Sequence, residues 1–155
     1  MNNCKLDEAH KQIDKENKTM KQTSKGWIYE SIYRGYSIMI IRVRQYGHLC
    51  GYIKTNMSKS SIEYNIIDNH FHGGVTFHDK EWIGFDCLHI NDFSPYQYKI
   101  FSEDLDFDKE TFFDKRYYRT LDEVKHCLVS TIDALKVKKR NASKIINKKG
   151  DYKYE

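Results

Sequence analysis

The side chains best suited to chemistry gather in one stretch of the sequence, residues 70–92. It holds four of the seven histidines, three of the eight glycines, one of the two tryptophans and one cysteine. Titratable side chains beside paired glycines at the end of a strand seldom all serve packing, and such groups cluster at functional sites. We therefore predict that four of them converge in one cleft: His72, Asp86, His89 and Asp92.

A predicted β-hairpin carries these residues, with arms at 75–77 and 82–85. In this register Phe77 lies opposite Trp82, an aromatic pair more typical of a core than of a ligand platform. Side chains alternate between the two faces of a strand, so Asp86 points away from the histidines unless a β-bulge interrupts the strand.

His72, Cys87 and His89 share the other face of this hairpin. An imidazole beside a thiol suits a thiolate nucleophile. The same three side chains also suit a three-ligand transition-metal site. The simplest interpretation of Cys87 is a small buried hydrophobe, so all three alternatives stay open.

The paired glycines Gly73 and Gly74 allow a ligand or a neighbouring strand to approach the backbone, or they form a plain bulge. A phosphate-binding loop is excluded because no helix follows them to supply aligned amides.

The elements that must position this stretch are predicted from periodicity. Three runs rich in aromatic and β-branched residues, at 27–33, 36–44 and 48–54, predict a meander of strands. Thr120 and Glu123 form a capping box, and apolar residues at helical spacing follow them. We expect an α+β fold: an antiparallel sheet, made of the meander plus the central hairpin, packed against a C-terminal amphipathic helix.

Composition divides the 155 residues into three parts. Residues 1–25 are polar, with only Leu6, Ile13 and Met20 spaced seven apart. A frayed amphipathic helix and a disordered arm both fit this pattern, and we favour a flexible N-terminal arm. Residues 26–139 form the single α+β domain, and residues 140–155 form a basic tail. We expect both ends to be dispensable for folding.

The basic charge belongs to the end of the chain. Residues 136–155 carry eight Lys and Arg against two Asp and Glu, which leaves 18 basic and 20 acidic residues elsewhere. A solvated end explains this pattern better than a phosphate-binding surface, so nucleic acid is not an expected partner. Whether the chain forms a homo-oligomer stays open.

No apolar run approaches the roughly 20 residues that a membrane span requires, so we expect a cytoplasmic protein without a membrane partner. The four cysteines form no CxxC pair, which argues against a zinc knuckle and against structural disulfides in a reducing compartment. The stretch 104–108 begins like a calcium loop, but Lys109 and Lys115 stand where the glycine and the glutamate belong. We expect no cofactor and no resident metal.

Three segments resemble a family of small uncharacterised proteins encoded by bacteriophages and prophages: His72-Gly-Gly-Val-Thr-Phe77, Trp82-Ile-Gly-Phe-Asp-Cys-Leu-His89 with Asp92, and Tyr117-Tyr-Arg-Thr-Leu-Asp-Glu-Val124. The family pattern reads HGG, a hydrophobic residue, T and an aromatic residue, then WxGFDxxHxxD, then Y(R/K)xLDxV. The resemblance covers residues 66–135 and implies a phage accessory protein made in a host bacterial cell, with no activity to carry over. Residues that match it and have chemical potential are His72, Gly73, Gly74, Thr76, Trp82, Asp86, His89 and Asp92.

The preferred functional hypothesis is a binding protein. A cleft lined by the Gly-Gly segment, the histidines and nearby aromatic residues would capture a small anionic, nucleotide-like ligand, for example to sequester a host immune signal. The expected ligand-binding residues are His72, Gly73, Gly74, Thr76, Trp82, Asp86 and His89.

Two alternatives belong to other classes. In a phosphodiesterase-like hydrolase, His72, Asp86, His89 and Asp92 would hold a metal or perform acid–base catalysis. Binding is preferred because no motif supplies an evident nucleophile or water-activating group. In the third hypothesis, a non-catalytic protein-binding accessory, the histidines are satisfied internally.

Overall fold

A computed structural model describes residues 2–103 and 115–150 of the chain. The stretch 104–108, rejected above as a calcium loop, lies outside these residues. Within the described residues, no helix combines the length and the apolar character that a membrane crossing requires.

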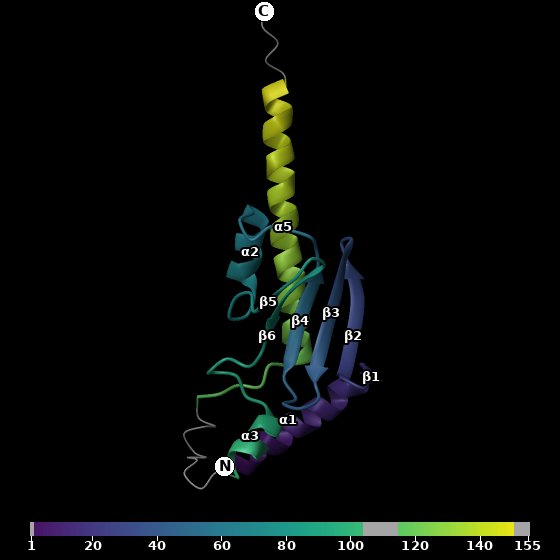
Figure 1. The fold of residues 1–155 in the computed structure, drawn as a ribbon, viewed down its shortest axis with the longest axis vertical. Helices are drawn as coiled ribbons and strands as arrows, with labels where there is room; N and C mark the ends of the chain where they lie inside the picture. Colours follow the sequence, from purple (N-terminus) through teal and green to yellow (C-terminus); the bar gives the residue numbers. More distant parts are fainter. Residues whose placement is uncertain (1, 104–114, 151–155) are drawn as a thin grey trace, which may run out of the picture.

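The centre of the fold is a six-stranded antiparallel sheet with the strand order β1-β2-β3-β4-β6-β5 (Figure 1). The meander and the hairpin are both present, and β4 pairs with β6 to join them. The α+β prediction is confirmed. The strands are β1 (Lys21–Thr23), β2 (Gly26–Tyr33), β3 (Tyr36–Val43), β4 (Leu49–Lys54), β5 (Phe77–His78) and β6 (Trp82–Asp86).

The central hairpin has a different register from the predicted one. Phe77 pairs with Gly84, not with Trp82, so the predicted aromatic pair is wrong. The cause is the side chain of Asp79, whose Oδ1 accepts hydrogen bonds from the backbone N–H groups of Glu81 (2.8 Å) and Trp82 (2.7 Å). This Asx-type turn moves the pairing by two residues, which leaves Phe77 on the same face as Gly84 and Trp82, as predicted.

Four helices accompany the sheet in the described part of the chain: α1 (Asn2–Asn17), α2 (Ile62–His70), α3 (Pro95–Phe101) and α5 (Leu121–Gly150). Helix α5 packs against one face of the sheet, with α2 beside it (Figure 1). The predicted capping box starts α5: Glu123 N–H donates to Thr120 Oγ1 (3.2 Å), and Thr120 N–H donates to Glu123 Oε2 (2.8 Å). Its apolar stripe is buried in the main core: Leu121, Val124, Leu128, Ile132 and Leu135.

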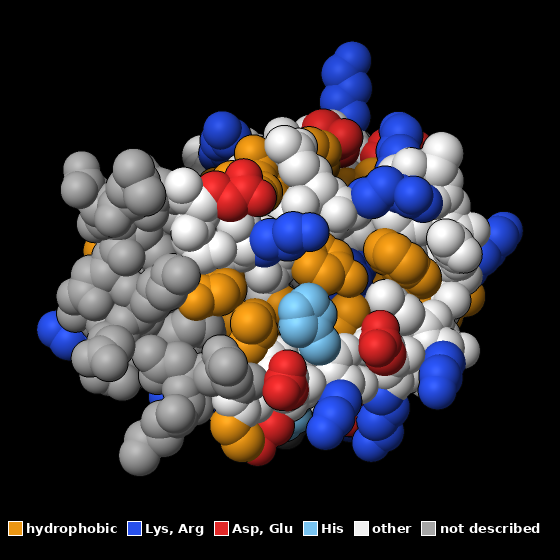
Figure 2. Space-filling model, turned by 90° about the horizontal axis from the view of Figure 1, so that it is seen from below, with side chains coloured by type: hydrophobic (Ala, Val, Ile, Leu, Met, Phe, Trp, Pro, Cys, Tyr) orange, Lys and Arg blue, Asp and Glu red, His pale blue; other side chains and the backbone are white. Residues whose placement is uncertain are grey.

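The N-terminal segment is not an unstructured arm, and that expectation is wrong. Helix α1 crosses one end of the sheet (Figure 1), and β1 then adds an edge strand. Ile13 and Met20, two of the three apolar residues spaced seven apart, are buried. Seen from the end where α1 lies, charged side chains of both signs are interspersed with hydrophobic ones (Figure 2).

A buried ion pair explains why α1 docks. The guanidinium of Arg42 on β3 is fully buried and contacts the carboxylate of Glu16, which is 4% exposed. Arg42 also donates to Asn17 Oδ1 (2.8 Å) and to the hydroxyl of Tyr118 (2.8 Å). A buried cation needs this compensation, and α1 supplies it.

The basic tail begins as a continuation of α5, which extends beyond the sheet to Gly150 (Figure 1). The last part of the predicted tail, residues 151–155, lies outside the described residues.

The ion pair predicts how α1 contributes to stability. Replacing Glu16 with alanine leaves Arg42 buried without its counter-ion, so the free energy of unfolding should fall by about 3–5 kcal/mol. Asp14→Ala, at an exposed position of the same helix, is the control and should change it by less than about 0.5 kcal/mol. Urea unfolding followed by circular dichroism measures both. Equal stability of the two variants would show that α1 is dispensable.

Candidate functional site

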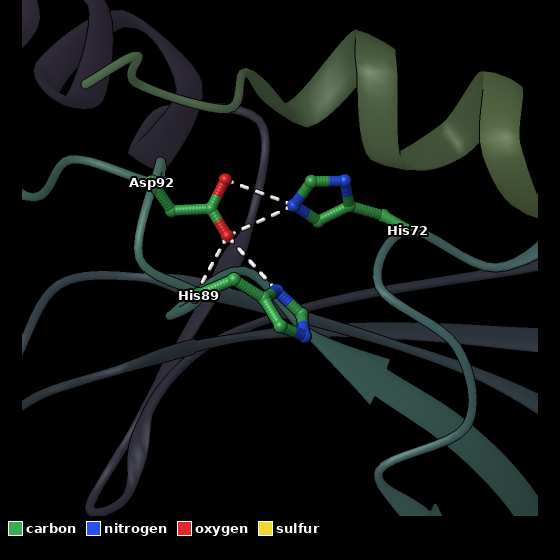
Figure 3. Close-up of side chains that lie close together, drawn as sticks. All are labelled: His72, His89 and Asp92. Atoms are coloured by element: carbon green, nitrogen blue, oxygen red, sulfur yellow. Dashed lines mark hydrogen bonds and ion pairs between the residues drawn. The ribbon is translucent and has the colours of Figure 1, made fainter. Parts of the chain in front are cut away.

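The candidate site is built around the buried carboxylate of Asp92, which is 1% exposed. His72 Nε2 lies 2.8 Å from Oδ1 and 2.9 Å from Oδ2, and His89 Nδ1 lies 3.0 Å from Oδ2 (Figure 3). We call these three residues the His–Asp cluster. Arg119 adds a positive charge beside this carboxylate, and its Nε donates a hydrogen bond to Asp92 Oδ1 (3.2 Å).

The geometry indicates which ring nitrogens carry protons. An ionised carboxylate only accepts hydrogen bonds, so the nitrogens that face it, His72 Nε2 and His89 Nδ1, are assigned as the donors. His72 Nδ1 and His89 Nε2 are then the basic nitrogens. The two rings lie edge to face, with their centroids 5.0 Å apart.

The spacing of His89 and Asp92 is set by a turn that follows β6. Asp92 N–H donates to the carbonyl of His89 (2.9 Å), and His89 N–H donates back to Asp92 Oδ2 (2.9 Å). One carboxylate therefore holds both the backbone and the ring of His89. A separation of three residues is what allows this reciprocal pair of bonds.

His72 reaches the cluster from the segment after α2. Gly73 follows it with φ +70°, and a Cβ there would lie 2.2 Å from His89 Nε2. The backbone must therefore pass directly against the His89 ring, which only glycine permits. Gly74 also has a positive φ, and the next residue, Val75, donates its N–H to Asp68 Oδ1 (2.8 Å).

Arg119 is a residue that the sequence analysis did not select. It is brought in by a short parallel bridge between Asp92 and Tyr117, in which Tyr117 N–H donates to the carbonyl of Asn91 (2.9 Å) and its carbonyl accepts from Phe93 N–H (2.9 Å). The sequence did contain a signal for Arg119, because this residue lies in one of the segments that carry the family resemblance, directly before the capping box.

Asp86 does not join the cluster, so its predicted convergence with the histidines is wrong. Within the described residues its Oδ1 accepts from Leu88 N–H (3.0 Å), while its own N–H donates to Thr76 Oγ1 (3.0 Å). No bulge interrupts β6, which continues through Asp86 as its last residue, so the strand does not turn Asp86 toward the histidines. Thr76 thus stabilises the end of the hairpin through this hydrogen bond. The Trp82 ring lies against Lys54, whose ammonium nitrogen is 5.8 Å from the ring centroid.

A cavity of about 590 Å³ lies beside the cluster, between the first turns of α5 and the ends of α2 and β6. Phe85 and Val124 give it apolar walls, while His72 and Arg119 belong both to the cavity and to the surroundings of Asp92. Two of its histidines, His70 and His126, were not predicted as site residues. The lining is His70, His72, Phe85, Cys87, Arg119, Asp122, Glu123, Val124, His126 and Cys127.

Electrostatics keep Asp92 ionised. Burial alone would raise the pKa of this carboxyl, but the hydrogen bonds from His72 and from the backbone of His89 outweigh burial and hold its pKa below the ordinary value. The carboxylate is therefore a permanent negative charge at neutral pH, available to orient the imidazoles or to bind a cation.

The thiolate alternative fits this site poorly. Cys87 is 4% exposed, and burial raises the pKa of its thiol well above the ordinary range. Burial also raises the pKa of Cys127, the other thiol of the cavity. A nucleophilic cysteine needs a lowered pKa, so the chemistry belongs to the imidazoles and the carboxylate.

Within the described residues, one group of His, Cys, Asp and Glu side chains has the arrangement of a metal site, and it is the His–Asp cluster. Each member offers one ligand atom, and these atoms lie within 4.8 Å of one another. The arrangement supports two kinds of chemistry: proton transfer by imidazoles that a carboxylate orients, or coordination of a cation.

The close approach at Gly73 gives a matched pair of substitutions. Gly73→Ala combines an unfavourable positive φ with a collision against His89, whereas Gly35→Ala has φ +84° and open space around its Cβ. We expect Gly35→Ala to lower the free energy of unfolding by about 1–2 kcal/mol and Gly73→Ala to lower it further. Urea unfolding measures both changes, and equal losses would contradict the assigned contact.

Burial of the thiols predicts their reactivity. At pH 8, iodoacetamide should alkylate the exposed Cys4 while Cys50 and Cys87 stay protected in the folded protein. Burial raises the pKa of Cys50 to about 11, so its thiolate becomes abundant only as the pH approaches that value. Peptide mapping by mass spectrometry identifies the labelled cysteines. Rapid alkylation of Cys87 at pH 7 would restore the thiolate alternative.

No family model, no curated protein and no solved structure matches the sequence. Interpretation of the site therefore depends on its own geometry and chemistry.

Proposed function

We propose that the protein binds a small anionic, nucleotide-like ligand in the cavity beside the His–Asp cluster. The observation that carries this proposal is the cavity itself. Its volume of about 590 Å³ lies within the range of roughly 300–1,000 Å³ that is typical of small-molecule sites. Apolar walls with a few polar groups are also typical of such sites.

The proposed ligand matches the two sides of the cavity. Phe85 and Val124, which are 1% and 2% exposed, form the apolar back of the cavity, where the base of the ligand would lie. On the other side, Arg119 is 32% exposed, donates through Nε to Asp92 and lies with Nη1 3.8 Å from Glu123 Oε1; its planar guanidinium is the group that would meet a phosphate. Asp122 also lines the cavity, but it is 92% exposed and lies 3.8 Å from Lys125. An anion is therefore expected beside Arg119 and His72.

The second candidate is a phosphodiesterase-like hydrolase, and the orientation of two imidazoles by one buried carboxylate favours it. Asp92 fixes the ring positions, which leaves His72 Nδ1 and His89 Nε2 as groups for acid–base work. The sequence alone offered no such constellation, which is why binding without cleavage was preferred there.

The biological setting in this proposal comes from the family resemblance. A phage accessory protein in the cytoplasm of a host bacterium would capture a nucleotide immune signal, either holding it or cleaving it. A protein-binding accessory without a small ligand is the remaining alternative, and the experiment below separates it from the other two.

Calorimetric titration with a panel of mononucleotides, dinucleotides and cyclic nucleotides tests the proposal. Arg119→Gln should weaken binding of the recognised nucleotide at least tenfold, which corresponds to about 1.4 kcal/mol. Arg140→Gln, an exposed change on α5, is the matched control and should bind like the unmodified protein.

Chromatography of the recovered nucleotide then distinguishes capture from hydrolysis. Intact nucleotide supports the binding function, and a cleaved product supports the hydrolase. If the whole panel fails to bind, or if Arg119→Gln binds as tightly as Arg140→Gln, the proposed function is wrong.

A further inference from the structure

We propose that the His–Asp cluster is a binding site for one divalent transition-metal ion of the zinc type. The ligand atoms would be His72 Nε2, His89 Nδ1 and one carboxylate oxygen of Asp92. This inference differs from the sequence-based expectation of no resident metal. It does not rest on nucleotide binding, because the ion alone serves as the probe.

The first argument is convergence. Both imidazoles direct one nitrogen at the same carboxylate (Figure 3), and Asp92 Oδ2 lies 2.9 Å from His72 Nε2 and 3.0 Å from His89 Nδ1. In a tetrahedral zinc site with bonds of about 2.0–2.2 Å, neighbouring ligand atoms are separated by roughly 3.3–3.5 Å. Entry of the ion would therefore lengthen the two nitrogen–oxygen separations by roughly 0.3–0.6 Å.

The second argument concerns which side chains of the cluster can move to admit an ion. Asp92 is buried and held by the backbone of His89 and by Arg119, so its carboxylate stays in place. His72 and His89 are 27% and 30% exposed, and neither lies in a helix or a strand. The groups that must shift are thus the more exposed members of the cluster.

The proton balance is also favourable. Each neutral imidazole would present the lone pair of the nitrogen that now faces Asp92, and its proton would move through solvent to the other ring nitrogen, His72 Nδ1 or His89 Nε2. No proton is released from a neutral histidine by this change of tautomer. Asp92 would ligate as a carboxylate, so the ion would meet a ligand set with one negative charge.

Ligand chemistry identifies the class of ion. Imidazole nitrogens suit zinc and neighbouring transition metals, whereas calcium and magnesium prefer oxygen ligands. Three protein ligands leave a fourth tetrahedral position open, as in catalytic zinc sites. His72 and Arg119 also line the cavity, so a ligand bound there lies next to the ion.

The surroundings of Asp92 resemble the outer shell of a metal site. Arg119 Nε donates to Oδ1 and the backbone N–H of His89 donates to Oδ2. Hydrogen bonds of this kind fix a ligating carboxylate in one orientation. Cys87, which the sequence had suggested as a third ligand, is replaced by Asp92 in this set.

The test is a zinc titration of tag-free protein that has been dialysed against a chelator, followed by competition with a chromophoric chelator. We expect one ion per chain. His72→Ala and His89→Ala should each weaken zinc binding at least tenfold. His126→Ala, an exposed histidine that lines the same cavity, should leave it unchanged.

Cobalt provides an independent readout, because a four-coordinate Co²⁺ site absorbs strongly in the visible region. The unmodified protein should develop this absorption at one equivalent, and Asp92→Asn should lose it. Circular dichroism of each metal-free variant checks folding, and the partly exposed His89→Ala keeps the test valid if Asp92→Asn does not fold.

The outcomes separate this inference from the proposed function. Absence of stoichiometric zinc binding, or equal losses in His72→Ala and His126→Ala, would overturn the metal site. Nucleotide binding by the metal-free protein would leave the proposed function standing in that case. Conversely, zinc binding without any nucleotide binding would support the metal site alone.

Discussion

The buried ion pair between Glu16 and Arg42 is the interaction on which the rest of the structure depends. Glu16 contacts the guanidinium with Oε2, accepts from the Tyr118 hydroxyl (2.7 Å), and accepts at Oε1 from the N–H of Leu121 (2.9 Å). A side chain of α1 thereby satisfies one of the first amides of α5. The sheet, α1 and the start of α5 therefore meet at one buried polar node, which consists of Glu16, Arg42 and Tyr118. Because the node is buried, each of its polar groups needs the others as partners.

This node also determines where the candidate site forms. The residues just before α5 run from Tyr117 to Thr120, so the node that fixes Tyr118 and the helix start also fixes Arg119, which contacts Asp92. Asp92 repeats the same principle on a smaller scale, since it is a buried carboxylate that is compensated by polar groups from three separate segments. The difference is exposure: His72, His89 and Arg119 are partly open to solvent, and a cavity adjoins them. The first node stabilises the fold, and the second has room for a ligand.

Burial separates the chemistry that the site supports from the chemistry that it does not. The same desolvation that raises the pKa of Cys87 and keeps it a thiol would also penalise the ionised Asp92. Hydrogen bonds reverse that penalty for the carboxylate, whereas the raised pKa of the thiol shows that nothing offsets burial to the same degree there. A stable negative charge between two imidazoles follows from this difference, and the proposed acid–base work and metal binding would both depend on it.

The sequence by itself determined the elements whose signals are local. Alternation and turn residues predicted the strands, and the capping box with its apolar stripe predicted α5, because hydrogen bonds and side-chain periods act over a few residues. The pair His89 and Asp92 was also within reach, since a three-residue turn joins them. The tertiary structure decided everything that depends on partners far apart in the chain. Docking of α1 required Arg42, 26 residues away, and Arg119 reached Asp92 across 27 residues. Asp86 stayed apart because β6 continued without a bulge. In a sequence, charged residues of this kind look like surface residues. Only the folded chain shows which of them are buried and therefore need a polar partner.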